Sequence, residues 1–147
     1  MAEKFIEMEL REIQTVEDPE RTQIIILEEK DGTRAFPIFI GLYEAKAMVM
    51  AAKGERTLRP LTHELVLNVI DGLGATLERV LIVELKQETF FGALELRSAT
   101  GEVIRIDSRP SDAIVIGTRR RVPLFVEEKV LREVQRGLGE EETEEKE

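Results

Sequence analysis

Two short segments of the chain place an arginine and a proline beside a hydroxyl and a carboxylate. The first is Arg59-Pro60-Leu61-Thr62-His63-Glu64, and the second is Arg109-Pro110-Ser111-Asp112. Proline favours the first turn of a helix, and apolar residues at helical spacing follow each segment, so each is predicted to begin a helix. Helix N-termini have unpaired N–H groups that can hold an anion, and arginine can bind phosphate oxygens in bidentate fashion. The two segments therefore predict an anion site.

The same segments contain side chains that could do acid–base or metal chemistry. His63 is the only histidine, and histidine can act as a general acid or base near neutral pH. Asp107 and Asp112 could approach one cation, and carboxylate oxygens suit magnesium. Alternatively, Asp112 caps its helix and Asp107 pairs with Arg109. Glu44 faces small apolar neighbours and needs a partner, which could be an arginine, the start of its own helix or a metal ion.

Structural roles compete with the chemical ones at the remaining polar positions. Thr62 and Ser111 suit helix capping better than nucleophilic attack. Arg59 and Arg109 could clamp phosphate or could brace the two corners by bonding backbone carbonyls. His63 could likewise hydrogen-bond a carbonyl and lock the start of its helix. The run 119–121 holds three arginines at a helix C-terminus, where the helix dipole alone favours them, although it could also contact a nucleic-acid backbone.

Composition narrows the class of protein. With 147 residues, 42% hydrophobic and 35% charged, the chain is expected to form one soluble globular domain. It has no cysteine, which excludes disulfides, zinc–thiolate sites and a thiol nucleophile. The net charge of −9 argues against a general nucleic-acid coat. The charged N-terminus and the short apolar runs predict a cytoplasmic protein without a membrane span. The small number of asparagine and glutamine residues resembles the composition of proteins from thermophiles.

The pattern along the chain predicts an α+β fold. Residues 139–147 hold six glutamates and one lysine and are predicted to form a disordered acidic tail after a single domain, 1–138. Pro37 predicts an edge strand or a bulge, and Leu65, Val66, Val69, Ile70 and Leu73 form one apolar stripe at helical spacing. The expected sheet is mixed and largely antiparallel, with about four helices in the order βββααβββαβα. The strands are expected at 5–16, 22–28, 33–40, 75–86, 90–98, 102–107 and 123–126, and the helices at 41–53, 62–73, 111–121 and 127–138.

An ordered set of motifs gives the chain a family resemblance. They are Pro37-Ile38-Phe39-Ile40-Gly41 with Glu44-Ala45, the segment 59–65, Phe90-Phe91-Gly92-Ala93-Leu94, the segment 106–114 and Val122-Pro123-Leu124-Phe125-Val126. Together they resemble the bifunctional nuclease domain family from about residue 5 to 135. The resemblance implies a compact α+β domain that often self-associates, with members that cleave DNA and RNA. The chain departs from the family pattern at 114–118, where a longer helix rich in alanine and leucine is usual.

The leading hypothesis is a nuclease that hydrolyses phosphodiester bonds of DNA and RNA, assisted by a divalent metal ion, Mg or Mn. Its DNA or RNA substrate would be the main partner, and a homo-oligomer is expected, most simply a dimer.

The rival hypothesis is a non-catalytic oligomeric module that binds an anion or a small phosphorylated ligand. A third possibility is that the motifs only stabilise the fold and a dimer interface. Under the leading hypothesis the roles are catalytic for His63, Asp112 and Asp107, phosphate-binding for Arg59, Arg109, Thr62 and Ser111, and metal-binding for Asp107, Asp112 and Glu44.

Overall fold

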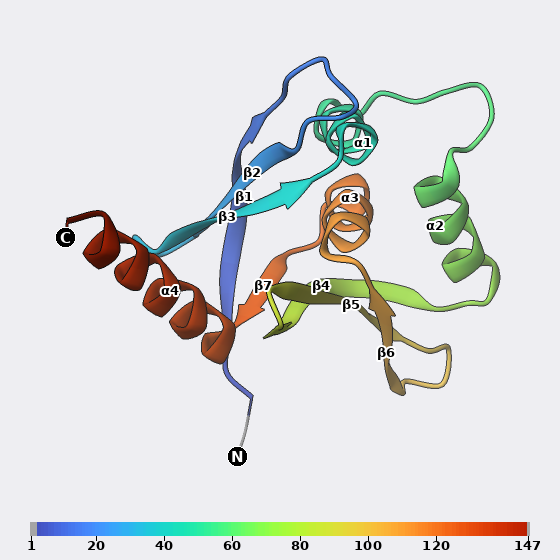
Figure 1. The fold of residues 1–147 in the computed structure, drawn as a ribbon. Coiled ribbons are helices and arrows are strands. Elements are labelled where there is room, and N and C mark those ends of the chain that lie inside the picture. The colour runs from blue at the N-terminus through green and yellow to red at the C-terminus, as the bar shows by residue number, and fades with distance from the viewer. Residues whose placement is uncertain (1–2, 147) are drawn as a thin grey trace.

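The computed structural model describes residues 3–146, and its elements follow the predicted order (Figure 1). The predicted single α+β domain with four helices is confirmed. The strands are β1 (Phe5–Gln14), β2 (Gln23–Glu29), β3 (Ala35–Ile40), β4 (Thr76–Lys86), β5 (Thr89–Arg97), β6 (Val103–Ser108) and β7 (Leu124–Glu127). The helices are α1 (Leu42–Lys53), α2 (Thr62–Gly72), α3 (Pro110–Arg120) and α4 (Glu128–Lys146).

All seven strands form one sheet in the order β3-β2-β1-β7-β4-β5-β6. Every pair is antiparallel except β4 and β7, which run parallel, so the sheet is mixed as predicted. Strand β3, which contains Pro37, lies at one edge of the sheet. A proline, which has no backbone N–H group, is tolerated there because an edge strand pairs with a neighbour on one side only. In strand β2, Ile25 and Leu27 are fully buried, while Ile24 and Ile26 are only partly covered.

Helix α3 lies at the centre of the fold, against α1, α2, β4 and β5 (Figure 1). Its β-branched run Ile114-Val115-Ile116 has modest helix propensity, yet all three side chains are at most 2% exposed. Burial on all sides thus stabilises a helix that local preference alone would not favour. Gly117 permits the close approach to the sheet, because a Cβ there would come within 2.7 Å of Val80 Cγ2. The departure from the family pattern at 114–118 therefore leaves α3 in place.

Helix α2 lies near β5 and β6, at the outside of the fold (Figure 1), and most of the apolar stripe of α2 is uncovered. Only Leu67 and Ile70 are buried, whereas Leu65, Val69 and Leu73 are 54, 51 and 77% exposed. The helix was correctly located by its periodicity, but the stripe does not form part of the core of the single chain.

Helix α4 lies on the other side of β1, β2 and β3 from α1 (Figure 1). Val130 and Leu131 are buried in the core and attach its first turns. The backbone is helical to Lys146, and the disorder of the acidic tail 139–147 stays a prediction. Glutamate and lysine have high helix propensity, so a helix already anchored at its start can extend through them. None of the helices described between residues 3 and 146 is long and apolar enough to span a bilayer.

Candidate functional site

Three helix N-termini meet at one ionic cluster. Glu44 lies in the first turn of α1, His63 in that of α2 and Asp112 in that of α3, while Arg109 immediately precedes α3. Arg109 donates to both Asp112 carboxylate oxygens, from Nε to Oδ2 at 2.8 Å and from Nη2 to Oδ1 at 3.0 Å. His63 Nε2 lies 2.9 Å from Asp112 Oδ1, and Arg109 Nη1 donates to Glu44 Oε1 at 3.3 Å. Four residues that the sequence singled out are thus brought together; we call them the ionic cluster.

Two glycines give the cluster the room it needs. Gly92 in β5 lies under the backbone that leads into α3: a Cβ there would come within 3.0 Å of Pro110 N and 3.1 Å of Arg109 C. Gly41 precedes α1, and a Cβ there would collide with the Glu44 carboxylate. Pro110 is the first residue of α3, where its fixed φ suits a helix start. The motifs Phe90–Leu94 and Pro37–Gly41 therefore support the cluster through backbone clearance.

The electrostatics of the cluster keep Asp112 ionised. The hydrogen bonds from Arg109 lower the pKa of the Asp112 carboxyl below its usual range, burial opposes this, and the His63 contact lowers the pKa further. The pKa of Arg109 is raised, chiefly by the same hydrogen bond to Asp112. The positive end of the α3 dipole also favours a carboxylate in the first turn. Asp112 is 27% exposed and His63 is 22% exposed, whereas the Arg109 side chain is 63% exposed and faces solvent.

The predicted phosphate-binding hydroxyls and the second arginine lie around the cluster without joining its hydrogen bonds. Leu61 and Arg109 are the N-cap residues of α2 and α3, and neither helix start has a side-chain cap, so the expected capping by Thr62 and Ser111 is not seen. Thr62 is exposed and Ser111 is buried. Arg59 is exposed in the loop before α2, and its side chain makes no ion pair with the side chains that the structure describes, those of residues 3–137. Its role in binding phosphate stays a prediction.

Asp107 is not part of the cluster. It lies on β6 opposite Ala93, and because Ile104 and Ile106 face the α2 side, strand alternation directs Asp107 to the opposite face. Across the described part of the chain, no three His, Cys, Asp or Glu side chains are arranged to hold a metal ion. The predicted ligand set of Asp107, Asp112 and Glu44 is not assembled, because Arg109 bridges the last two residues. Metal binding and the assignments for Asp107 stay predictions that this geometry does not support.

The arginines at the end of α3 serve mainly as structural contacts. Arg119 contacts the backbone carbonyl of Glu55 and lies 3.7 Å from Glu64, measured from Nη2 to Oε1. Arg120 pairs with both carboxylate oxygens of Asp71 at 2.9 and 3.0 Å. These bonds tie α3 to the loop after α1 and to α2. Glu64 thus points to a different partner from the adjacent His63, as its position about 100° further around the helix predicts.

Ser108 is a residue near the cluster that sequence reasoning missed. Its Oγ, at the end of β6 and next to Arg109, is buried and has no hydrogen-bond partner in the described structure. A serine after Asp107 carries no distinctive spacing, so the sequence offers no signal for it. The clearance provided by Gly92 was likewise not predicted, since it depends on a contact between residues of different elements.

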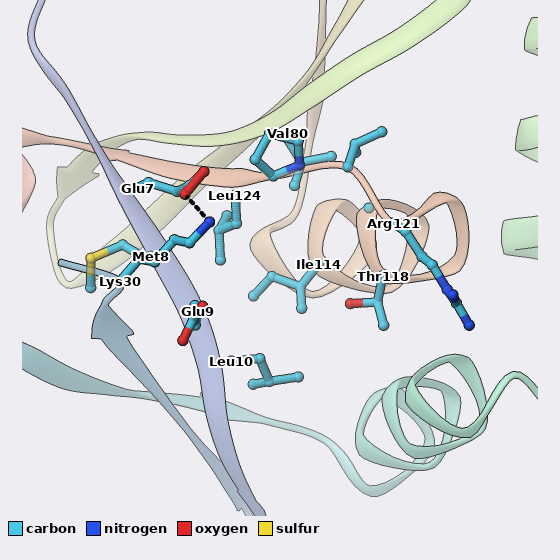
Figure 2. Close-up of a pocket in the computed structure, with 13 residues that line it drawn as sticks. Glu7, Met8, Glu9, Leu10, Lys30, Val80, Ile114, Thr118, Arg121 and Leu124 are labelled. Atoms are coloured by element: carbon cyan, nitrogen blue, oxygen red, sulfur yellow. Dashed lines mark ion pairs between the residues drawn. The ribbon is translucent and has the colours of Figure 1, made fainter.

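A separate hollow of about 540 Å³ lies between β1 and α3 (Figure 2). In it Lys30 Nζ pairs with Glu7 Oε2 at 3.1 Å, and Arg121 lies at the far end from Glu7 and Glu9 (Figure 2). None of the predicted site residues lines this hollow, and its charged groups do not converge on one point. The ionic cluster therefore remains the candidate site.

The fold and the cluster define an α+β domain with a histidine–carboxylate–arginine site at the junction of three helices. The sequence profile of the bifunctional nuclease domain matches residues 25–138, and the chain therefore belongs to the bifunctional nuclease domain family. The matched range contains every member of the ionic cluster. The family resemblance drawn from the sequence motifs is thereby confirmed.

Relatives of the chain include a bacterial protein and longer plant proteins. An uncharacterised protein of Mycobacterium tuberculosis is 40% identical over 116 residues, which cover 79% of this chain and 68% of the relative. Bifunctional nuclease 1 of Arabidopsis thaliana is 30% identical over 105 residues, covering 69% of this chain and 32% of the plant protein. Bifunctional nuclease 2 of Oryza sativa subsp. japonica is 33% identical over the same length and share. The chain thus spans about a third of the plant proteins.

Proposed function

We propose that this protein is a nuclease that hydrolyses phosphodiester bonds of DNA and RNA at the ionic cluster. The observation that carries the proposal is the hydrogen bond of 2.9 Å between His63 Nε2 and Asp112 Oδ1, with Arg109 bound to the same carboxylate. Membership of the bifunctional nuclease domain family supports a nuclease-type activity. Two plant relatives are named bifunctional nucleases, and the expectation that both DNA and RNA are substrates is what the family resemblance implies.

In the proposed mechanism Asp112 positions His63. An ionised carboxylate can only accept a hydrogen bond, so the shared proton lies on His63 Nε2. In the neutral imidazole the lone pair is then on Nδ1, which can take a proton from the attacking water. The bonds from Arg109 keep Asp112 in the ionised form that this arrangement requires. Asp112 thus acts as a positioning residue, and His63 moves the proton.

Arg109 supplies the positive charge for the scissile phosphate. Its guanidinium donates to Asp112 from Nε and Nη2 and to Glu44 from Nη1, and its side chain is 63% exposed, so the remaining N–H groups are available toward solvent. A guanidinium held on both sides is already oriented before substrate binds, which reduces the entropy lost on binding. Arg59, in the exposed loop before α2, is the second proposed phosphate contact. Dependence on magnesium or manganese is a further part of the proposal.

The rival function, binding of a phosphorylated ligand without turnover, is favoured by two observations. Both carboxylate oxygens of Asp112 are already bonded within the protein. In addition, the net charge is −9, so the surface as a whole does not attract polyanions. A binding module of this kind would be stabilised by its ligand in a thermal unfolding experiment and would leave nucleic acid intact.

The test is cleavage of labelled single-stranded DNA and RNA by the purified wild-type protein and by His63→Ala prepared identically. The reactions are run without added metal, with magnesium, with manganese and with EDTA. Cutting by the wild-type protein that falls at least about 100-fold in His63→Ala supports the proposal. Equal cutting by both proteins, or no cutting under any condition, refutes it, and EDTA sensitivity decides the metal requirement separately.

A further inference from the structure

A hollow lined by arginines lies at the C-terminal ends of α1 and α3. The two helices pack against each other with their N-termini at the ionic cluster, and the last residues of both line this hollow at the opposite end. Its volume is about 510 Å³, and we call it the arginine pocket. The polar side chains that line it are Arg56, Thr118, Arg119 and Arg121, and the side chains described within residues 3–137 add no carboxylate to the lining. The pocket is therefore positively charged.

The charges of the pocket are only partly neutralised. Arg56 and Arg121 are exposed and make no ion pair with the side chains that the structure describes, those of residues 3–137. Arg119 is the fixed member, because its side chain is 10% exposed and contacts the backbone carbonyl of Glu55. The carboxylate that pairs with it, Glu64, lies outside the lining, with Oε1 3.7 Å from Nη2. At least two positive charges thus remain in the pocket of a chain whose net charge is −9.

The helix C-termini do not by themselves explain these arginines. Carbonyls in the last turns of α1 and α3 already accept the backbone N–H groups of residues 54, 55, 121 and 122, at 2.9 to 3.2 Å. Arg121 moreover has a φ of 56°, in the left-handed region where the residue after a helix is usually glycine. An arginine there costs conformational free energy, and its side chain points away from Glu7 and Glu9 (Figure 2). Because non-glycine residues in such conformations cluster at ligand sites, the position of Arg121 indicates a role in binding.

We propose that the arginine pocket binds a phosphate monoester, the group carried by a nucleotide and by the phosphorylated end of a nucleic-acid strand. At pH 7 this group carries a charge of about −1.5 to −2 and three terminal oxygens, which guanidinium groups bind through paired hydrogen bonds. An internal phosphodiester has one charge and two such oxygens, so it uses the three arginines and Thr118 less fully. The described lining holds no aromatic ring, so the pocket is expected to accept any base. Its volume is typical of a small-molecule site and leaves room for the attached sugar.

The test is isothermal titration calorimetry with adenosine 5′-monophosphate as the probe, at low salt and about pH 7.5, where the phosphate is a dianion. Adenosine, which lacks the phosphate, should not bind, and cytidine 5′-monophosphate should bind as well as the adenine nucleotide. Arg56→Ala and Arg121→Gly should each raise the dissociation constant at least about tenfold, since each removes a charged hydrogen-bond donor. Glycine suits the left-handed backbone of residue 121, so Arg121→Gly should unfold at the same or a higher temperature than the wild-type protein.

The matched control is Arg132→Ala on α4, which replaces a 71% exposed arginine and should bind the probe as the wild-type protein does. A phosphorothioate-linked trinucleotide, which resists hydrolysis, identifies the source of the group. Tighter binding than the mononucleotide when its 5′ or 3′ end is phosphorylated assigns the pocket to strand ends, and weaker binding assigns it to free nucleotides. Equal binding of adenosine, no binding of the mononucleotide, or unchanged binding by both pocket variants would overturn the proposal. These measurements need no cleavage, so they decide the pocket independently of the nuclease proposal.

Discussion

Replacing Asp112 with asparagine tests the central contact of the ionic cluster while keeping the shape of the side chain. Asp112 takes part in three contacts of 2.8 to 3.0 Å, two from Arg109 and one with His63. In Asp112→Asn one oxygen becomes an NH₂ group, which faces a donor instead of accepting from it. The negative charge that orients the His63 N–H group is lost at the same time. We therefore expect activity to fall much more than stability.

The two effects differ in size for a structural reason. Hydrogen bonds to a charged group contribute about 1.5–3 kcal/mol each when buried, but Asp112 is 27% exposed and Arg109 is 63% exposed, so solvent screening reduces the sum. A loss of about 1–2 kcal/mol in unfolding free energy is expected, which lowers the melting temperature by about 4 °C for each kcal/mol. Losing the carboxylate that positions the base His63 is expected to reduce kcat/KM by at least about 100-fold.

The assay is cleavage of labelled single-stranded DNA and RNA, with thermal unfolding followed by circular dichroism on the same preparations. Asp71→Asn is the matched control, because Asp71 also bonds both its oxygens to an arginine, Arg120, at 2.9 and 3.0 Å. It lies away from the cluster and should leave kcat/KM unchanged. The reasoning fails if Asp112→Asn cleaves as well as the wild-type protein, or if Asp71→Asn loses as much activity.

Three further outcomes are expected. Arg109→Lys keeps the charge but loses the bidentate geometry, so KM should rise about tenfold in the cleavage assay while the melting temperature changes little; an unchanged KM would contradict the phosphate role. The pKa values of the Asp112 and Glu95 carboxyls are lowered in the folded state. The two carboxylates therefore stabilise the fold fully above their unfolded pKa values of 3.8 and 4.5, and this stabilisation is lost as the pH falls through their folded pKa values. Urea unfolding between about pH 2 and 7 should show that the free energy of unfolding falls only at the acid end. Gly92→Ala crowds the backbone before α3 and should lower the melting temperature, whereas Gly72→Ala, with open space around it, should raise it slightly.

The sequence alone determined the elements and their order, because these follow from local patterns. Alternating and β-branched runs located the strands, and the Arg-Pro segments located the starts of α2 and α3 to within a residue. Pro37 predicted an edge strand or a bulge, and the structure has the edge strand; the missing N–H group acts at the residue itself, so the effect is local. The ordered motifs also identified the family. Local chemistry was less decisive for the end of α4, where helix propensity and charge repulsion act in opposite directions.

The tertiary structure decided which of the candidate residues meet. His63 and Asp112 are 49 positions apart, and only the packing of α2 against α3 brings them within hydrogen-bond distance. Asp107 is closer to Asp112 in sequence, yet strand alternation places its side chain on the opposite face of the sheet. The apolar stripe of α2 has the same periodicity whether a core or a second chain covers it, so its exposure could not be predicted either. Residue types and spacing thus fix what a side chain can do, whereas its partners depend on long-range packing that no local pattern records.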